Sequence, residues 1–207
     1  IIAGGVTIIL TAENTYCDPV EDELILTVDP LPVMTCPDNF DICVSSDPET
    51  LTGGLPAGGE YAGQGVTAGV FDPSIGAGTY EITYSYTDPG TGCSNECTFE
   101  ITVNALPVLS CPADATVCED ASSFDLTGAV PEGGTYSGEG VNAGNFDPSV
   151  AGVGTHTITY IYTDQTTSCT DSCDFDIEVA PAPTVDAGED QTVCEGVDVQ
   201  LNATVEN

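Results

Sequence analysis

The sequence predicts an all-β chain built as a tandem array of small β-sandwich domains that disulfides staple. The first observation is a repeat: the stretch 58–74, which begins Gly58-Gly59-Glu60-Tyr61, recurs 75 positions later as 133–149. The second is the strict alternation of apolar and polar residues in runs such as 79–87, which is typical of half-buried antiparallel strands. The third is the set of ten cysteines, four of which fall in each full repeat. Because an internal repeat decides the architecture, we assign the remaining segments of the chain by their match to it.

The repeat divides the chain into four segments. Residues 1–30 match the C-terminal half of a repeat, 31–105 and 106–180 are full repeats, and 181–207 match the N-terminal half of a further one. A linker at 29–32, Asp-Pro-Leu-Pro, separates the first two segments, because proline keeps its neighbours extended and out of helices. Six or seven short strands in each full repeat, with turn signals between them, predict a small β-sandwich.

The long strands and their turns recur at matching places. In the first full repeat, Tyr80, Ile82 and Tyr84 share one face of the strand 79–87, and 97–103 is its hairpin partner. We expect the corresponding pairs at 156–164 with 173–179 and at 6–11 with 23–28, and a further strand at 197–203. Asp72 and Asp147 precede prolines, where an aspartate is expected to cap its own turn.

The charge is extreme and one-sided. The 207 residues contain no Lys or Arg, one His, and 34 Asp plus Glu, for a net charge of −34. Nucleic acid and anionic membrane surfaces are therefore excluded as electrostatic partners, because both require basic residues. No apolar run is long enough to insert in a membrane. Divalent cations are the natural small partners of such a chain.

The cysteines indicate an oxidising compartment. Cysteine-rich small domains are typical of exported proteins, so we expect the chain to be secreted, on a cell surface or in an extracellular matrix. The spacings Cys-x6-Cys and Cys-x3-Cys do not match the usual zinc sites. Two disulfides in each repeat, at about 2–4 kcal/mol each, would offset a hydrophobic core that is small for an independent domain.

The incomplete repeats predict how the cysteines pair. The last segment keeps Cys194 but has Ala187 in the place of Cys111, and the first segment keeps Cys17 but has Glu21 or Asp22 in the place of Cys97. Two positions that lose their cysteines together are expected to be partners. The expected bonds are Cys36–Cys97, Cys43–Cys93, Cys111–Cys173 and Cys118–Cys169.

Cys17 and Cys194 are then the two halves of the second bond type, at opposite ends of the chain. We expect them to bond to other copies or to flanking repeats. In the sharper form of this hypothesis, 181–207 of one copy and 1–30 of the next build one composite sandwich, which propagates a filament head to tail. The two segments have 57 residues together against the 75 of a full repeat, so some strands would be missing.

Catalysis is not expected. The one histidine, His156, aligns with Tyr80 on the inward face of its strand, which favours a structural role. The chain has no motif of a Ser-His-Asp hydrolase or a zinc protease. The glycine pairs at Gly63 and Gly138 do not open a helix, so they are turn glycines rather than a phosphate-binding loop. The sequence predicts a protein that is not an enzyme.

Calcium is a candidate ligand. Acidic residues gather at the expected domain junctions and after the long strands, where short linkers could bring them together around Ca²⁺. The alternative is a solvated acidic surface that keeps exposed sheet edges apart. The candidate ligands are Asp29, Asp38, Asp88, Asp114, Asp164, Asp186, Glu189 and Asp190.

The motif order resembles a known repeat class. The pattern Cys-Pro, Val-Cys, Gly-Gly-x-Tyr-x-Gly-x-Gly-Val, Phe-Asp-Pro and Ile-Thr-Tyr-x-Tyr-Thr-Asp is similar to the Ig-like or PKD-like repeats of giant surface proteins. Those proteins are exported by gliding bacteria with type IX secretion and include gliding-motility adhesins. The stretch 184–193 also resembles the opening strand of PKD-type domains. The resemblance implies tandem Ig-like domains, with a PKD-like repeat beginning at 181.

Together these observations favour a structural segment of an extracellular filament, fibre or adhesin stalk. The alternative is an Ig-like module that binds a surface glycan or a protein. That function would need an exposed aromatic platform, for which Tyr61 and Tyr136 are the candidates, although their place in the repeated motif favours packing.

Overall fold

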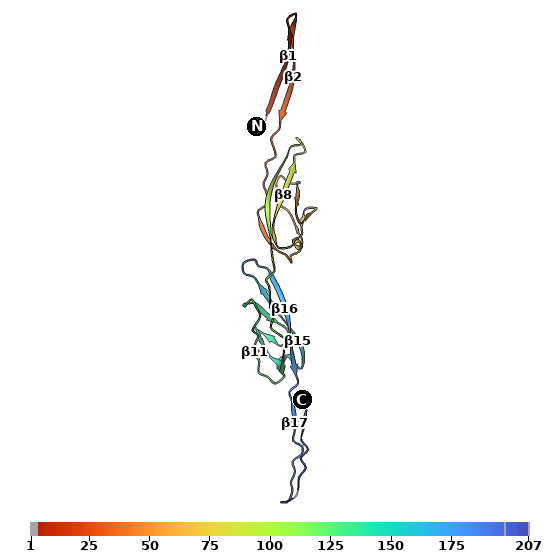
Figure 1. Cartoon of the computed structure of the whole chain (residues 1–207), viewed down its shortest axis with the longest axis vertical. Helices are drawn as coiled ribbons and strands as arrows, with labels where there is room; N and C mark the ends of the chain where they lie inside the picture. The colour runs from red at the N-terminus through yellow and green to blue at the C-terminus, as the bar shows by residue number, and fades with distance from the viewer. Residues whose placement is uncertain (1–3, 197, 207) are drawn as a thin grey trace. The chain divides into compact units, whose positions relative to one another are not determined.

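The structure is a computed structural model that describes residues 4–196 and 198–206. The chain divides into two compact units, residues 1–105 and 106–207, each with one full repeat and one terminal segment. Strands are the main element of both units (Figure 1). The predicted all-β fold of disulfide-stapled, Ig-like sandwiches is confirmed.

Each full repeat folds as a four-stranded sheet packed on a three-stranded one. In the first repeat the larger sheet has the order β3 (Phe40–Cys43), β9 (Ser94–Asn104), β8 (Gly78–Thr87) and β5 (Glu60–Gly63), and the smaller one β4 (Glu49–Thr50), β7 (Val70–Phe71) and β6 (Val66–Thr67). The strand pairs are antiparallel except β3 with β9, which is parallel. A 3-10 turn, η1 (Pro73–Ile75), precedes β8.

The second repeat has the same topology. Its larger sheet has the order β10 (Ala115–Cys118), β16 (Thr170–Ala180), β15 (Gly154–Thr163) and β12 (Thr135–Ser137). Its smaller sheet has the order β11 (Phe124–Asp125), β14 (Asn145–Phe146) and β13 (Val141–Asn142). The short helix α1 (Pro148–Ala151) takes the place of the 3-10 turn.

The core of each repeat lies between its two sheets. The predicted alternation holds, because Ile82 and Tyr84 of β8 are buried together with Phe99 and Ile101 of β9, and Phe71 covers them from the smaller sheet. The core of the second repeat uses the corresponding positions, which are Phe146, Ile158, Tyr160, Phe175, Ile177 and Val179. Burial of each such large side chain contributes about 1.5–3 kcal/mol, so the long hairpins organise both domains.

The Gly-Gly-x-Tyr motif closes the sandwich against a buried tyrosine. The backbone N–H of Gly59 donates to the hydroxyl oxygen of Tyr84 (2.9 Å), and that hydroxyl donates to the carbonyl of Pro56. A Cβ at Gly59 would lie 2.3 Å from the carbonyl oxygen of Ser85 and 2.5 Å from the Tyr84 ring. In the second repeat, Gly134 and Tyr160 make the same contact at 2.7 Å. Glycine is therefore required here for close approach.

Aspartates cap the turns before the long strands, as predicted. The Asp72 carboxylate accepts the backbone N–H of Ser74 (2.9 Å), and the Asp147 carboxylate accepts the N–H of Ser149 (3.0 Å). In both turns a proline follows the aspartate at the first position of the helical turn, where its fixed φ fits and no N–H is needed.

The terminal segments form separate two-stranded sheets. Strands β1 (Gly4–Asn14) and β2 (Cys17–Val28) pair as an antiparallel hairpin, so both strands predicted there are formed. In the last segment, β17 (Thr184–Asp186) pairs with β18 (Thr204–Glu206). The strand predicted over 197–203 is wrong for residues 198–203, and residue 197 lies outside the described residues. Its counterpart β11 pairs with β14, for which this segment has no equivalent.

Candidate interaction sites

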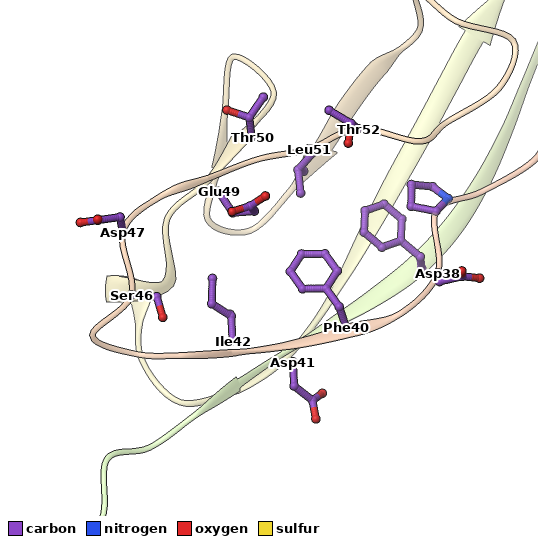
Figure 2. Close-up of a pocket in the computed structure, with 12 residues that line it drawn as sticks. Asp38, Phe40, Asp41, Ile42, Ser46, Asp47, Glu49, Thr50, Leu51 and Thr52 are labelled. Atoms are coloured by element: carbon purple, nitrogen blue, oxygen red, sulfur yellow. The ribbon is translucent and has the colours of Figure 1, made fainter. Parts of the chain in front are cut away.

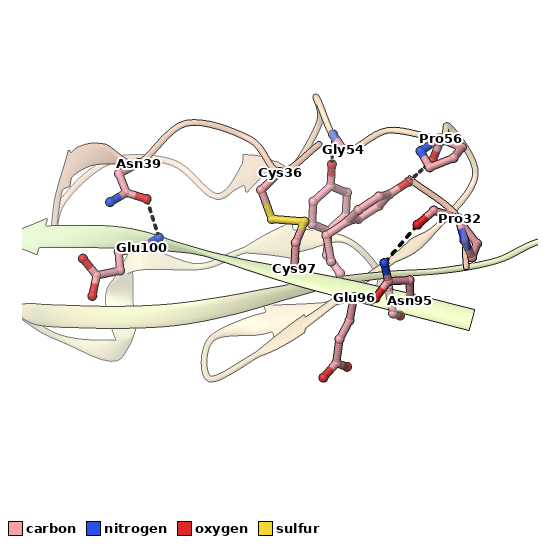
Figure 3. The surroundings of a disulfide bond; sticks show 12 residues. Pro32, Cys36, Asn39, Gly54, Pro56, Asn95, Glu96, Cys97 and Glu100 are labelled. Carbon is pink, nitrogen blue, oxygen red and sulfur yellow. Dashed lines mark hydrogen bonds between the residues drawn. A yellow bond between two sulfur atoms is a disulfide. The ribbon is translucent and has the colours of Figure 1, made fainter. Parts of the chain in front are cut away.

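One disulfide fastens the start of each full repeat to its closing strand. Cys36 is bonded to Cys97 and Cys111 to Cys173, and the Cα atoms are 5.9 Å apart in both pairs. These are two of the four bonds expected from the sequence. Around the first bond, the side-chain amide of Asn95 donates to the Pro32 carbonyl (2.9 Å), as Figure 3 shows. The chain therefore runs into each sandwich alongside the beginning of the closing strand.

The other two expected bonds are wrong. Cys93 and Cys118 are thiols, and although Cys43 and Cys169 are disulfide-bonded, they are not bonded to these partners. Strand pairing explains why. Cys43 lies opposite Asn104, at the end of β9, whereas Cys93 precedes the first residue of β9. Ten residues of strand span about 33 Å, and a disulfide requires Cα atoms within about 7 Å.

The second repeat separates its cysteines in the same way. Cys118 lies opposite Ala180 at the end of β16, and Cys169 precedes the first residue of that strand. Each repeat thus has a leading end, where its first residues lie beside the start of the closing strand, and a trailing end, where that strand finishes. Cys93 belongs to a leading end, and its sulfur lies 4.0 Å from the Asp29 carbonyl oxygen. Cys43 and Cys118 belong to trailing ends.

The β1–β2 hairpin corresponds to the long hairpin of a full repeat. Gly4 pairs with Val28 as Gly78 pairs with Val103, and the two glycines have φ values of +156° and +158°. The Asn14 side chain accepts the N–H groups of the second and third residues after it, as Asp88 does. On this register Asp22, opposite Leu10, is the residue that stands in the place of Cys97.

The inward face of this hairpin is uncovered. Its five apolar side chains are between 49% and 72% exposed, whereas Ile82, Tyr84, Phe99 and Ile101, the counterparts of four of them, are at most 3% exposed. The five residues, called the hairpin face below, are Val6, Ile8, Leu10, Leu24 and Leu26. Contiguous apolar patches of this kind mark interaction sites.

The candidate calcium ligands lie apart. Among residues 4–196 and 198–206, no three His, Cys, Asp or Glu side chains gather as a metal site would require. The Asp164 carboxylate accepts the N–H groups of Thr167 and Thr166, which lowers its pKa. Asp88, Asp114 and Asp186 likewise accept backbone N–H groups. The other four, Asp29, Asp38, Glu189 and Asp190, are exposed.

A cavity of about 600 Å³ opens between β3 and β4 of the first repeat. Figure 2 shows Phe40, Ile42 and Leu51 facing into it, while Asp41 points away from it. Glu49 stands on its rim. The counterpart of Glu49 in the second repeat is Phe124, whose ring centroid lies 5.7 Å from that of Phe146. The two repeats therefore differ at this position, with a glutamate on the rim of the cavity in the first and a packed phenylalanine in the second, a difference that comparison of the two repeats could have shown.

The proposed aromatic platform is packed instead. The hydroxyl oxygen of Tyr61 accepts the N–H of Gly54 (2.8 Å), and its ring lies 4.7 Å from that of Tyr84. Tyr136 accepts the N–H of Ala129 (3.2 Å) and lies 4.8 Å from Tyr160. Both tyrosines therefore stabilise the sandwich.

His156 is also structural. It is buried, and its Nε2 atom lies 2.8 Å from the Gly152 carbonyl oxygen. In the first repeat, the hydroxyl of Tyr80 donates to the carbonyl of Gly76 (2.9 Å) from the same place. The histidine therefore repeats a contact that positions the preceding turn.

No helix of the described residues is long and apolar enough to cross a membrane. Neither a known protein family nor a curated protein matches the chain. Among solved structures, it is similar to the EC1–3 segment of Drosophila N-cadherin, with 15% identity and a TM-score of 0.30, over 86% of this chain and 78% of that one. At this score, the likeness says nothing about what this chain binds.

Proposed function

We propose that this chain is a structural segment of an extracellular filament, fibre or adhesin stalk. The observation that carries the proposal is that both full repeats use their shared motif residues in the same structural contacts. Gly59 and Gly134 contact a buried tyrosine, and Asp72 and Asp147 cap turns. A motif that is repeated to build the domain, rather than to present side chains outward, suits a spacer.

The same reasoning supports a protein that is not an enzyme and that works outside the cell. The inward positions of the motif are occupied by packing residues, and the disulfide at each leading end suits an oxidising environment. The resemblance of the motif order to repeats of gliding-motility adhesins agrees with this role. Because four candidate ligands accept backbone N–H groups, we propose that divalent cations act on the array by screening its charge.

Electron microscopy of the native material tests the function. Antibodies raised against the two full repeats should label fibres or stalks on the cell surface, along their length. Labelling confined to the tips of surface structures, or to material without any elongated form, would overturn the structural role.

The cavity favours one alternative, a module that binds a glycan or a protein. Its apolar floor and carboxylate rim could hold a ligand with an apolar body and a positive group. Glu49→Phe would give the first repeat the residue that the second repeat has. If a ligand found by glycan array or pull-down loses binding in this variant but not in Asp41→Asn, whose side chain points away, the cavity is a binding site.

A further inference from the structure

We propose that two copies of this chain join head to tail, with residues 181–206 of one copy covering the hairpin face of the next. The proposal rests on the filament role above and names the contact that would build it. It commits to a second copy of the chain as the occupant of the hairpin face.

The hairpin face is missing a strand that each full repeat provides. In the second repeat, β10 pairs in parallel with the end of β16, with Val117 opposite Val179. The corresponding edge belongs to the end of β2, where Val28 is the counterpart of Val179. In the β1–β2 sheet, β2 has β1 as its neighbour. An added parallel strand would complete this edge through main-chain hydrogen bonds.

The last segment has the matching strand in an unpaired state. Thr192-Val193-Cys194 repeats the residues Thr116-Val117-Cys118 of β10, but it lies outside any strand and is exposed. The register of the full repeat places Thr192 opposite Thr27 of the second copy, and Val193 opposite Val28. Leu201, seven residues after Cys194, is 78% exposed, whereas Leu126, eight residues after Cys118 in the second repeat, is 8% exposed in the core. Leu201 is therefore the side chain expected to cover Leu24 and Leu26.

The cysteine positions support the same pairing of segments. In the full repeats, the first early cysteine is bonded to the last late one. The first and last segments replace both members of that pair, by Asp22 and Ala187. A composite sandwich made from the two segments would therefore lack both cysteines of this pair, so that no unpaired cysteine would be left at this place.

The remaining thiols then match in number and in place. By position in the repeat, Cys17 and Cys93 are leading-end thiols, and Cys118 and Cys194 are trailing-end thiols. In a head-to-tail pair, Cys118 meets Cys17 of the second copy, and Cys194 meets Cys93 of the second copy. This replaces the expectation that Cys17 and Cys194 form one bond type, because they would lie at opposite ends of the composite sandwich.

Bond formation requires an oxidant. Each bond forms by thiol–disulfide exchange with a small disulfide such as oxidised glutathione. One cysteine thiolate first forms a mixed disulfide and releases one glutathione thiolate. The second cysteine thiolate then displaces the other, so that two cysteines are oxidised and one glutathione disulfide is reduced, and the two protons lost by the cysteine thiols pass to the two glutathione thiolates.

Two features weaken the association. The segments lack counterparts of β12 to β14, so part of the hairpin face stays uncovered. Both segments also carry acidic residues within a chain of net charge −34, so the two copies repel each other at low ionic strength. Salt screens this repulsion. The association should therefore depend on protein concentration and increase with salt.

The test uses the 207-residue chain in 0.5 M NaCl with a glutathione redox buffer, followed by analytical ultracentrifugation. Three proteins are compared: wild type, Leu26→Asp on the hairpin face, and Ile25→Asp on the opposite face of the same strand. Wild type and Ile25→Asp should form dimers and longer oligomers, while Leu26→Asp should remain at least tenfold more monomeric. Circular dichroism checks that each variant retains its strands.

Peptide mapping of the oligomers without reduction completes the test. The expected linkages are Cys17 with Cys118 and Cys93 with Cys194. Monomeric wild type, equal association of the two variants, or a Cys17–Cys194 linkage would each overturn the proposal. Fibres in native material together with a monomeric isolated chain would leave the structural role standing and refute only the head-to-tail contact.

Discussion

Cys43 and Cys93 lie beside opposite ends of strand β9. Cys43 is opposite its last residue, Asn104, and Cys93 comes just before its first, Ser94. Because β3 runs parallel to β9, the second early cysteine is carried to the trailing end of the sandwich. Each full repeat therefore has one staple inside it and one cysteine at either end, an arrangement suited to joining units end to end.

The internal staple should contribute measurably to stability. Replacing Cys36 and Cys97 together by serine should lower the free energy of unfolding of the first repeat by about 2–4 kcal/mol, because the bond restricts the unfolded chain. Urea unfolding followed by circular dichroism measures this. Cys93→Ser, which removes a thiol, is the matched control and should change little. Equal effects of the two replacements would show that the bond does not stabilise the domain.

The buried tyrosine hydroxyl should matter as much as its ring. Tyr84→Phe removes the hydroxyl that accepts from Gly59 and donates to Pro56, so it leaves two backbone groups without that partner. We expect a loss of about 1–3 kcal/mol, and the same for Tyr160→Phe. Tyr16→Phe, at a side chain that is 95% exposed, should have no effect in the same thermal or urea unfolding experiment.

The capping aspartates should stabilise the fold at neutral pH and not in acid. The hydrogen bonds from Ser149 hold the pKa of Asp147 below its ordinary value of 3.8. Between the two values the native state binds fewer protons than the unfolded chain, so this contribution is present above about pH 4 and is lost as pH falls through the folded pKa.

The substitution Asp147→Asn removes the negative charge but keeps a side-chain oxygen that can accept a hydrogen bond. Wild type should be more stable than this variant at pH 7, and the difference should vanish as the pH falls below the lowered pKa of Asp147. Ser149→Ala, which removes one donor to Asp147, should reduce the same difference. A variant that is as stable as wild type at pH 7 would mean that the capping charge contributes nothing.

Divalent cations should act without strong selectivity. If they screen a chain of net charge −34, Ca²⁺ and Mg²⁺ at equal concentration should raise the melting temperature by similar amounts. Differential scanning calorimetry in chelated buffer, with additions of each chloride, measures the shifts. A rise with Ca²⁺ that clearly exceeds the rise with Mg²⁺ would indicate a built calcium site.

Local patterns in the sequence predicted local structure well. The alternation in 79–87 predicts the buried side of β8, and the Asp-Pro pairs predict caps, because strands and turns depend on neighbouring residues. The Cys36–Cys97 bond could be predicted because the last segment lacks the first cysteine of this pair and the first segment lacks the second.

Long-range pairing was less accessible. The spacing of Cys43 and Cys93 does not reveal that β3 pairs in parallel with β9, which sets the two cysteines about 33 Å apart. The sequence also did not predict that Ile8 and Leu24 are exposed. Both belong to runs that match buried strands of the full repeats, but in the described part of the chain the second sheet that buries those strands has no counterpart packed on the β1–β2 hairpin.

Disulfide mapping of the native material is the most direct measurement. The chain has no Lys or Arg, so it is digested without reduction by enzymes that cut at Asp and Glu, with sites at Asp38 and Glu96 between the relevant cysteines. We expect peptides that link Cys36 to Cys97 and Cys111 to Cys173. Recovery of peptides that link Cys43 to Cys93, or Cys118 to Cys169, would contradict it, because each pair lies at opposite ends of one strand.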